Sequence, residues 1–131
     1  MTVVVGYVPT REGEAALGHA IQEARTRGAR LLVVNTSRGD ALVDQRYIDD
    51  EQLAALRERL ASSGVDHEVL HSIGGREASE EIVTVAADRH ADLVVIGLRR
   101  RTAVGKLLMG STAQRVLLEV SCPVLAVKSP R

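Results

Sequence analysis

Short aliphatic runs alternate with amphipathic stretches along the whole chain. The aliphatic runs cover residues 2–5, 29–35, 66–72, 92–97 and 123–128. Runs of this length, rich in branched residues, are typical of buried strands. The third run is more polar and predicts a strand at the edge of the sheet with one face exposed to solvent. Between the runs, apolar residues recur at three- and four-residue spacing, which predicts helices. The helix positions are residues 12–27, then Leu53, Leu56 and Leu60, then Ala78, Ile82, Val85 and Ala86, and last Ala113, Val116, Leu117 and Val120.

Polar and glycine residues mark the ends of these elements. Thr10 follows a proline and is placed to cap the first helix, and Gly28 is placed to end it. The second helix ends near Gly64, and the fourth begins at Gly110 and Ser111. The polar residues 36–45 are predicted to form a loop.

The order of elements is β-α-β-α-β-α-β-α-β. Right-handed crossovers turn that order into a doubly wound α/β fold, in which helices cover both faces of a parallel five-stranded sheet. The chain has 131 residues, no internal repeat and no composition break. We therefore expect a single domain over residues 1–131.

Composition narrows the function classes. Hydrophobic residues make up 45% of the chain but aromatic residues only 2%, so the core must be aliphatic, and stacking on the bases of single-stranded nucleic acid is disfavoured. The net charge is zero, so no global field attracts DNA or an anionic membrane. Cys122 is the one cysteine, interpreted as a packing residue in a reducing compartment. Because no signal peptide and no membrane-spanning run is recognised, we expect a cytoplasmic protein.

The loop after residues 92–97 combines glycines, cations and hydroxyl groups. These are Gly97, then Arg99, Arg100, Arg101 and Lys106, and finally Gly110, Ser111 and Thr112. Gly97 would let a ligand approach the backbone, while the free N–H groups and hydroxyls at the helix start would bind an anion. The guanidinium groups would neutralise phosphate. The loop therefore predicts a polyphosphate cradle, with the alternative that the arginines are surface ion-pair donors and the glycine a simple cap.

Other chemistry is not supported by the residue pattern. Lys106 is followed by leucine rather than serine or threonine, so the loop is not a P-loop. His67 and His71 share a strand face but have no third ligand nearby in sequence, so no metal site is predicted. No catalytic residue stands out, which leaves at most a weak ATPase as an enzymatic interpretation.

The segment from residue 92 to residue 128 resembles the universal stress protein family. That family's signature is glycine, two residues, glycine, nine residues, then glycine and serine or threonine. Gly97 matches its first position, and Gly110 and Ser111 match its last pair. Residues 75–77, 91–97 and 122–127 are similar to the family as well. The resemblance implies sheet order 3-2-1-4-5 and a stress-response module that binds an adenine nucleotide, ATP above all, with Mg²⁺ as its companion.

The resemblance also implies a homodimer formed through the last strand, between Pro123 and Val127. This segment is apolar and would be an exposed sheet edge in a monomer, which proteins normally cover. No nucleic acid or membrane is expected as a partner.

The chain departs from the family pattern at two positions. Arg100 replaces the middle glycine of the signature, and Val8 stands where the ATP-binding branch has an aspartate. The adenine side would map to Gly6, Val8 and Thr36. The departures motivate an alternative function, a dimerisation or interaction module of the same family that binds no nucleotide.

Overall fold

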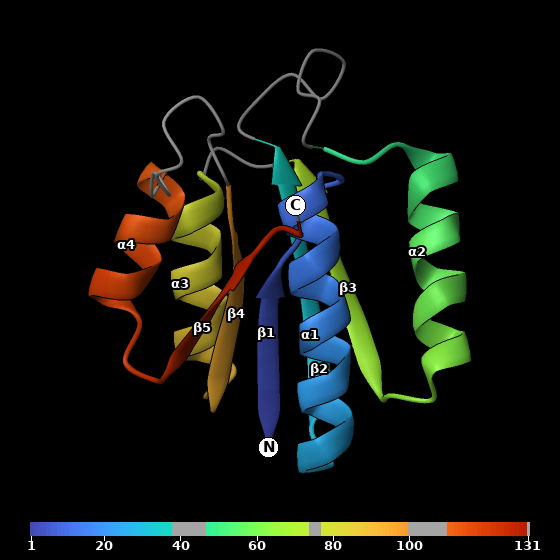
Figure 1. Ribbon diagram of the computed structural model, residues 1–131, viewed down its shortest axis with the longest axis horizontal. Coiled ribbons are helices and arrows are strands. Elements are labelled where there is room, and N and C mark those ends of the chain that lie inside the picture. Colours follow the sequence, from blue (N-terminus) through green and yellow to red (C-terminus); the bar gives the residue numbers. More distant parts are fainter. Residues whose placement is uncertain (38–46, 74–76, 100–109, 131) are drawn as a thin grey trace.

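The computed structural model describes residues 1–37, 47–73, 77–99 and 110–130, and within them five strands alternate with four helices (Figure 1). The elements are β1 (Thr2–Gly6), α1 (Arg11–Arg27), β2 (Arg30–Ser37), α2 (Asp50–Ser63), β3 (His67–Ile73), α3 (Ala78–Asp88), β4 (Leu93–Leu98), α4 (Ser111–Glu119) and β5 (Val124–Lys128). The alternation predicted from the hydrophobic pattern is confirmed.

The strands form one parallel sheet in the order β3-β2-β1-β4-β5. Strand β1 is central, with Val4 paired to Leu32 of β2 on one side and to Val94 of β4 on the other. The doubly wound fold and the strand order implied by the family resemblance are both confirmed. The expectation that the third strand lies at an edge is confirmed as well.

Two helices cover each face of the sheet. Alternate residues of β1 point to opposite faces, so Val3 and Val5 pack with α1 and α2, while Val4 packs with α3 and α4. All three valines are fully buried. Both clusters are essentially aliphatic, as the composition predicts, and Tyr7 is the aromatic residue among the buried side chains of the described chain.

Thr10 and Gly28 cap α1 as predicted. The Thr10 hydroxyl accepts a hydrogen bond from the Gly13 amide at 3.1 Å, which fixes the start of α1. Gly28 ends α1 with a left-handed φ of 63°. Asp49 caps α2 in a reciprocal capping box with Gln52.

The sequence-based prediction of a loop from residue 36 was wrong by two residues. Strand β2 continues to Ser37, because Thr36 and Ser37 pair with Ser72 and Ile73 of β3. The strands of a parallel sheet are joined by hydrogen bonds between backbone groups. Polar residues can therefore extend a strand when the neighbouring strand continues as well. Strand β4 likewise includes Leu98, paired with Lys128.

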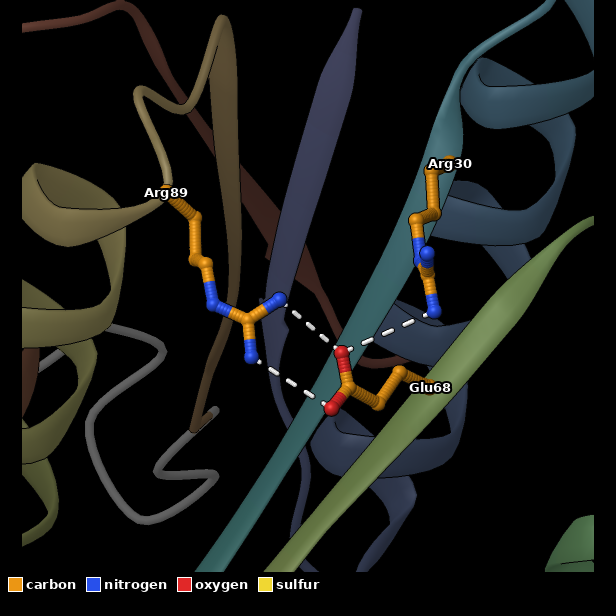
Figure 2. Close-up of polar contacts among 3 residues, drawn as sticks. All are labelled: Arg30, Glu68 and Arg89. Carbon is orange, nitrogen blue, oxygen red and sulfur yellow. Dashed lines mark hydrogen bonds and ion pairs between the residues drawn. The ribbon is translucent and has the colours of Figure 1, made fainter.

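A charged network lies on edge strand β3 (Figure 2). The Glu68 carboxylate accepts two hydrogen bonds from the Arg89 guanidinium, at 2.9 and 3.3 Å, and its Oε2 lies 3.6 Å from Nη2 of Arg30. The hydrogen bonds from Arg89 hold the pKa of Glu68 below its usual value. The network joins the starts of β2 and β3 to the end of α3, and it places charge on an edge that could otherwise pair with another strand.

We expect Glu68→Gln to lower the melting temperature at pH 7 by roughly 1–3 °C, because it removes the carboxylate that two arginines share. Since folding lowers the pKa of Glu68, its contribution is present above the unfolded-state pKa of about 4.3 and is lost as pH falls through the lower folded-state value. Calorimetry of both proteins at several pH values measures this difference. Glu23→Gln, which breaks a single exposed pair with Arg27, is the matched control and should have a smaller effect. A Glu68→Gln difference that does not shrink in 1 M salt would contradict an electrostatic origin.

Candidate functional site

The carboxyl ends of β1 and β4 mark the point where the winding direction of the sheet reverses. From β1 the chain moves to β2 and β3 on one side, and it returns to β4 and β5 on the other. Ligands of open parallel sheets bind outside the strand ends at such a point. Figure 1 shows that β1 leads into α1 at this edge and that α4 also begins there. We call Glu12, Gly97, Arg99 and residues 110–112 together the switch-point site.

Gly97 is in close contact with the first turn of α1. A Cβ atom at this position would lie 2.3 Å from the carbonyl oxygen of Glu12. The sequence interpretation assigned this glycine to the approach of a ligand. In the structure its missing side chain makes room for the backbone of α1, so it has a packing role within the protein.

The start of α4 is open at its N-cap. Gly110 caps the helix with φ −72° and ψ 166°, and no described atom lies within 4 Å of the position that a Cβ would take. Glycine has no side chain that could accept hydrogen bonds from the free N–H groups of the first turn, so these donors can face a ligand. Ser111 is exposed and Thr112 is half-buried, so both predicted hydroxyl residues lie at this helix start.

Arg99 follows β4 directly and is 64% exposed. Its Nε lies 3.7 Å from Oε1 of Glu12, whose side chain is only 16% exposed. The alternative interpretation, an arginine acting as an ion-pair donor, therefore describes part of what Arg99 does. The other predicted cations of this loop, Arg100, Arg101 and Lys106, lie outside the described residues.

The residues assigned to the adenine side lie at neighbouring strand ends. Gly6 pairs with Val34, and Ile82 of α3 occupies the space that a side chain of Gly6 would need, with its Cδ1 2.6 Å from that position. Val8 is half-buried, and its carbonyl oxygen accepts a hydrogen bond from the Thr10 amide at 2.8 Å. Thr36 lies in β2, two residues beyond Val34. The structure thus brings these positions to the same edge of the sheet as the switch-point site.

Sequence reasoning missed Asn35, which connects the residue after β1 to the segment before α2 at this edge of the sheet. Asn35 is 1% exposed, and its Nδ2 donates to the Tyr7 carbonyl at 3.0 Å while its Oδ1 accepts from the Ile48 amide at 3.2 Å. Nε2 of His71 lies 2.9 Å from the Ile48 carbonyl oxygen. One polar residue at the end of an aliphatic run was the available signal, because such a residue is buried only with hydrogen-bond partners.

Tyr7 connects the same edge to both helices of one face. Its hydroxyl donates to Glu14 of α1, which also pairs with Arg59 of α2. Burial, and next the hydrogen bond to Glu14, raise the pKa of Tyr7 above its usual value. Tyr7, which directly follows β1, is therefore fixed in place by hydrogen bonds of its side chain as well as of its backbone.

The described residues include no group of three metal-ligating side chains. Nδ1 of His67 lies 2.8 Å from the Val65 carbonyl oxygen, and His71 stacks on Tyr47 with ring centroids 4.2 Å apart. Cys122 is half-buried against the α3 and α4 cluster, which agrees with a packing role, and burial raises the pKa of its thiol. None of the helices in the described segments has the length and apolar character needed to cross a membrane.

Comparison with known proteins shows the family. The model of the universal stress protein family matches residues 1–128. The chain belongs to the universal stress protein family. A universal stress protein of Mycolicibacterium smegmatis is 46% identical over 126 residues, which are 96% of each chain.

Solved universal stress proteins share the fold over nearly the whole chain. One from Archaeoglobus fulgidus has a TM-score of 0.81 and 30% identity, with 98% of each chain covered. Another structure from Archaeoglobus fulgidus, in complex with dAMP, has a TM-score of 0.68 and 27% identity, again with 98% of each chain covered. A universal stress protein in complex with cAMP has a TM-score of 0.70 and 26% identity, and covers 99% of this chain and 98% of its own. The family resemblance noted in the sequence is confirmed.

The two matched glycines of this universal stress protein differ in their surroundings, and a pair of alanine variants tests the difference. We expect Gly97→Ala to lower the free energy of unfolding by about 1–3 kcal/mol, because the methyl group would overlap the Glu12 backbone. Gly110→Ala has open space and should cost less than about 1 kcal/mol. Urea unfolding of both variants measures the contrast. Equal losses would mean that the packing of α1 on β4 does not require a glycine.

Proposed function

We propose that this universal stress protein is a regulatory module that binds an adenine nucleotide at the switch-point site. The observation that carries the proposal is the N-terminus of α4, where Gly110 provides no side-chain cap for the amide donors, at the edge of the sheet where its winding direction reverses. Two family members of 26–27% identity are described in complex with cAMP and with dAMP, which supports the same ligand class here.

The residues present suit the parts of a nucleotide. The amides and hydroxyls of Ser111 and Thr112 would bind phosphate, with Arg99 supplying positive charge and Arg100 as a further proposed contact. The ends of β1 and β2, with Gly6, Val8 and Thr36, would lie against the nucleoside. Val8 offers only a backbone carbonyl where the ATP-binding branch has a carboxylate, so the nucleoside would be held more by packing than by a side-chain hydrogen bond.

ATP is the specific ligand that we propose within this class, accompanied by Mg²⁺ with the Ser111 hydroxyl as a candidate ligand of the metal. We propose a cytoplasmic protein in which nucleotide occupancy regulates a response to stress. In this role the nucleotide is bound as a regulatory ligand and not as a substrate.

Calorimetric titration with ATP, ADP, AMP and cAMP tests this function, with Gly110→Asp as the informative variant. An aspartate at this N-cap should cap α4 and hold or raise the melting temperature, yet lower nucleotide affinity at least roughly tenfold, because its carboxylate takes the amide donors and repels phosphate. Gly110→Asn is the matched control, which caps the helix without a charge. Absence of binding by the wild-type protein to all four nucleotides at millimolar concentration would favour a dimerisation or interaction module that needs no nucleotide.

We also propose a homodimer formed through β5, in the segment from residue 123 to residue 127. Strand β5 is an edge of the described sheet, and Val124, Leu125 and Ala126 are only partly buried. On α4, the helix that precedes β5 in the chain, Leu118 is 85% exposed. Apolar side chains on an edge strand are normally covered by another chain or element.

Light scattering should give a mass near twice the 14.1 kDa of one chain at micromolar concentration, because pairing of the two edges removes their apolar side chains from water. Dilution should shift the mass toward that of one chain only at much lower concentration. A mass of one chain throughout the micromolar range would contradict the proposed dimer.

A further inference from the structure

Glu12 introduces a negative charge where the proposed ligand is also negative. Its side chain is 16% exposed, and its carbonyl oxygen packs against Gly97 at the end of β4. The partner of its carboxylate within the described part of the chain is Arg99, at 3.7 Å. Gly97 lies near the end of β4 and Arg99 directly follows it, so this carboxylate lies at the edge of the sheet where α4 also begins (Figure 1).

The carboxylate is fixed in place rather than free to swing into solvent. Glu12 lies in the first turn of α1, where the helix dipole favours an acidic side chain. Its low exposure and its contact with Arg99 hold it further. Arg99, at 64% exposed, has room to turn toward a ligand, whereas Glu12 does not.

The charges of Glu12 and Arg99 cancel. Among the described residues of the switch-point site, what then remains for an anion is the partial positive charge of the α4 N-terminus, about half an elementary charge. When Arg99 turns to contact phosphate, the Glu12 carboxylate loses its partner and repels the ligand. The repulsion grows with each negative charge that the ligand carries.

We infer that Glu12 is a specificity-determining residue that makes the switch-point site select among adenine nucleotides by charge, disfavouring polyphosphates relative to monophosphate and cyclic esters. The inference rests on the proposed nucleotide-binding function and deepens it. ATP remains a ligand of the site, but one whose affinity this carboxylate reduces.

Glu12 could instead serve only to position Arg99, and the two roles predict opposite signs. If positioning dominates, loss of the carboxylate lets Arg99 move away and weakens the binding of every phosphate-bearing ligand. If charge selection dominates, loss of the carboxylate strengthens binding, and strengthens it most for the most highly charged ligand. Salt also separates the roles, because the charge effect is screened at high ionic strength.

The decisive experiment is calorimetric titration of the wild-type protein and Glu12→Gln with adenosine, cAMP, AMP and ATP. The titrations are made without Mg²⁺, so that the ligands carry zero and about one, two and four negative charges at neutral pH. We expect Glu12→Gln to raise the affinity for ATP roughly tenfold and for cAMP about twofold, with AMP between them and adenosine unchanged. In 0.5 M salt these ratios should shrink toward one.

Matched variants separate charge selection from general effects. Glu23→Gln makes the same change in net charge near the other end of α1 and should leave all affinities unchanged. Arg99→Gln should lower the affinity for ATP more than for cAMP, and melting temperatures show that each variant is folded.

Three results would overturn the inference. Equal changes for all ligands, or weaker binding of ATP by Glu12→Gln, would refute charge selection while leaving the proposed function intact. Binding of no ligand by either protein would refute the proposed function, and charge selection with it.

Discussion

The site depends on a close backbone contact between the first turn of α1 and the ends of β1 and β4. A Cβ atom at Gly13 would lie 1.8 Å from the Val8 carbonyl oxygen, and one at Gly97 would lie 2.3 Å from the Glu12 carbonyl oxygen. Side chains at these two positions would push the helix away from the sheet by more than close-packed interiors tolerate. The contact fixes where Glu12 and Arg99 meet, and thus the charge that the proposed ligand would encounter.

Hydrogen bonds from buried side chains complete this edge. Asn35 joins the end of β1 to the segment before α2, and His71 of β3 contacts the same segment at Ile48. Each such bond contributes only about 1 kcal/mol, but leaving a buried donor or acceptor without a partner costs more. Strand ends held in this way would allow the proposed site to bind a ligand with defined geometry, because little conformational freedom would remain to be lost on binding.

Local sequence patterns predicted the helices and strands, whereas tertiary contacts determine which residues meet at the candidate site. Thr10 and Gly28 could be assigned as caps from sequence, because their interactions lie within a few residues. The pairing of Glu12 with Arg99 could not, since it joins helix and strand residues far apart in the chain and no spacing rule connects them. Gly97 shows the same limit: its spacing marked it as a candidate site residue, but did not reveal the Glu12 backbone that occupies the space of its missing side chain. The extension of β2 to Ser37 also depended on a neighbour, strand β3, rather than on the polar residues themselves.

The nearly non-aromatic core has a practical consequence for spectroscopy. The chain contains no tryptophan and two tyrosines, so its ultraviolet emission comes from Tyr7 and Tyr47 alone. The Tyr7 hydroxyl donates a hydrogen bond to the Glu14 carboxylate, whereas Tyr47 stacks on His71 near the carboxyl end of β3. Tyr47 is therefore a native fluorophore at the carboxyl edge of the sheet, where the nucleotide is proposed to bind, and its signal can report on events there without a dye or an engineered label.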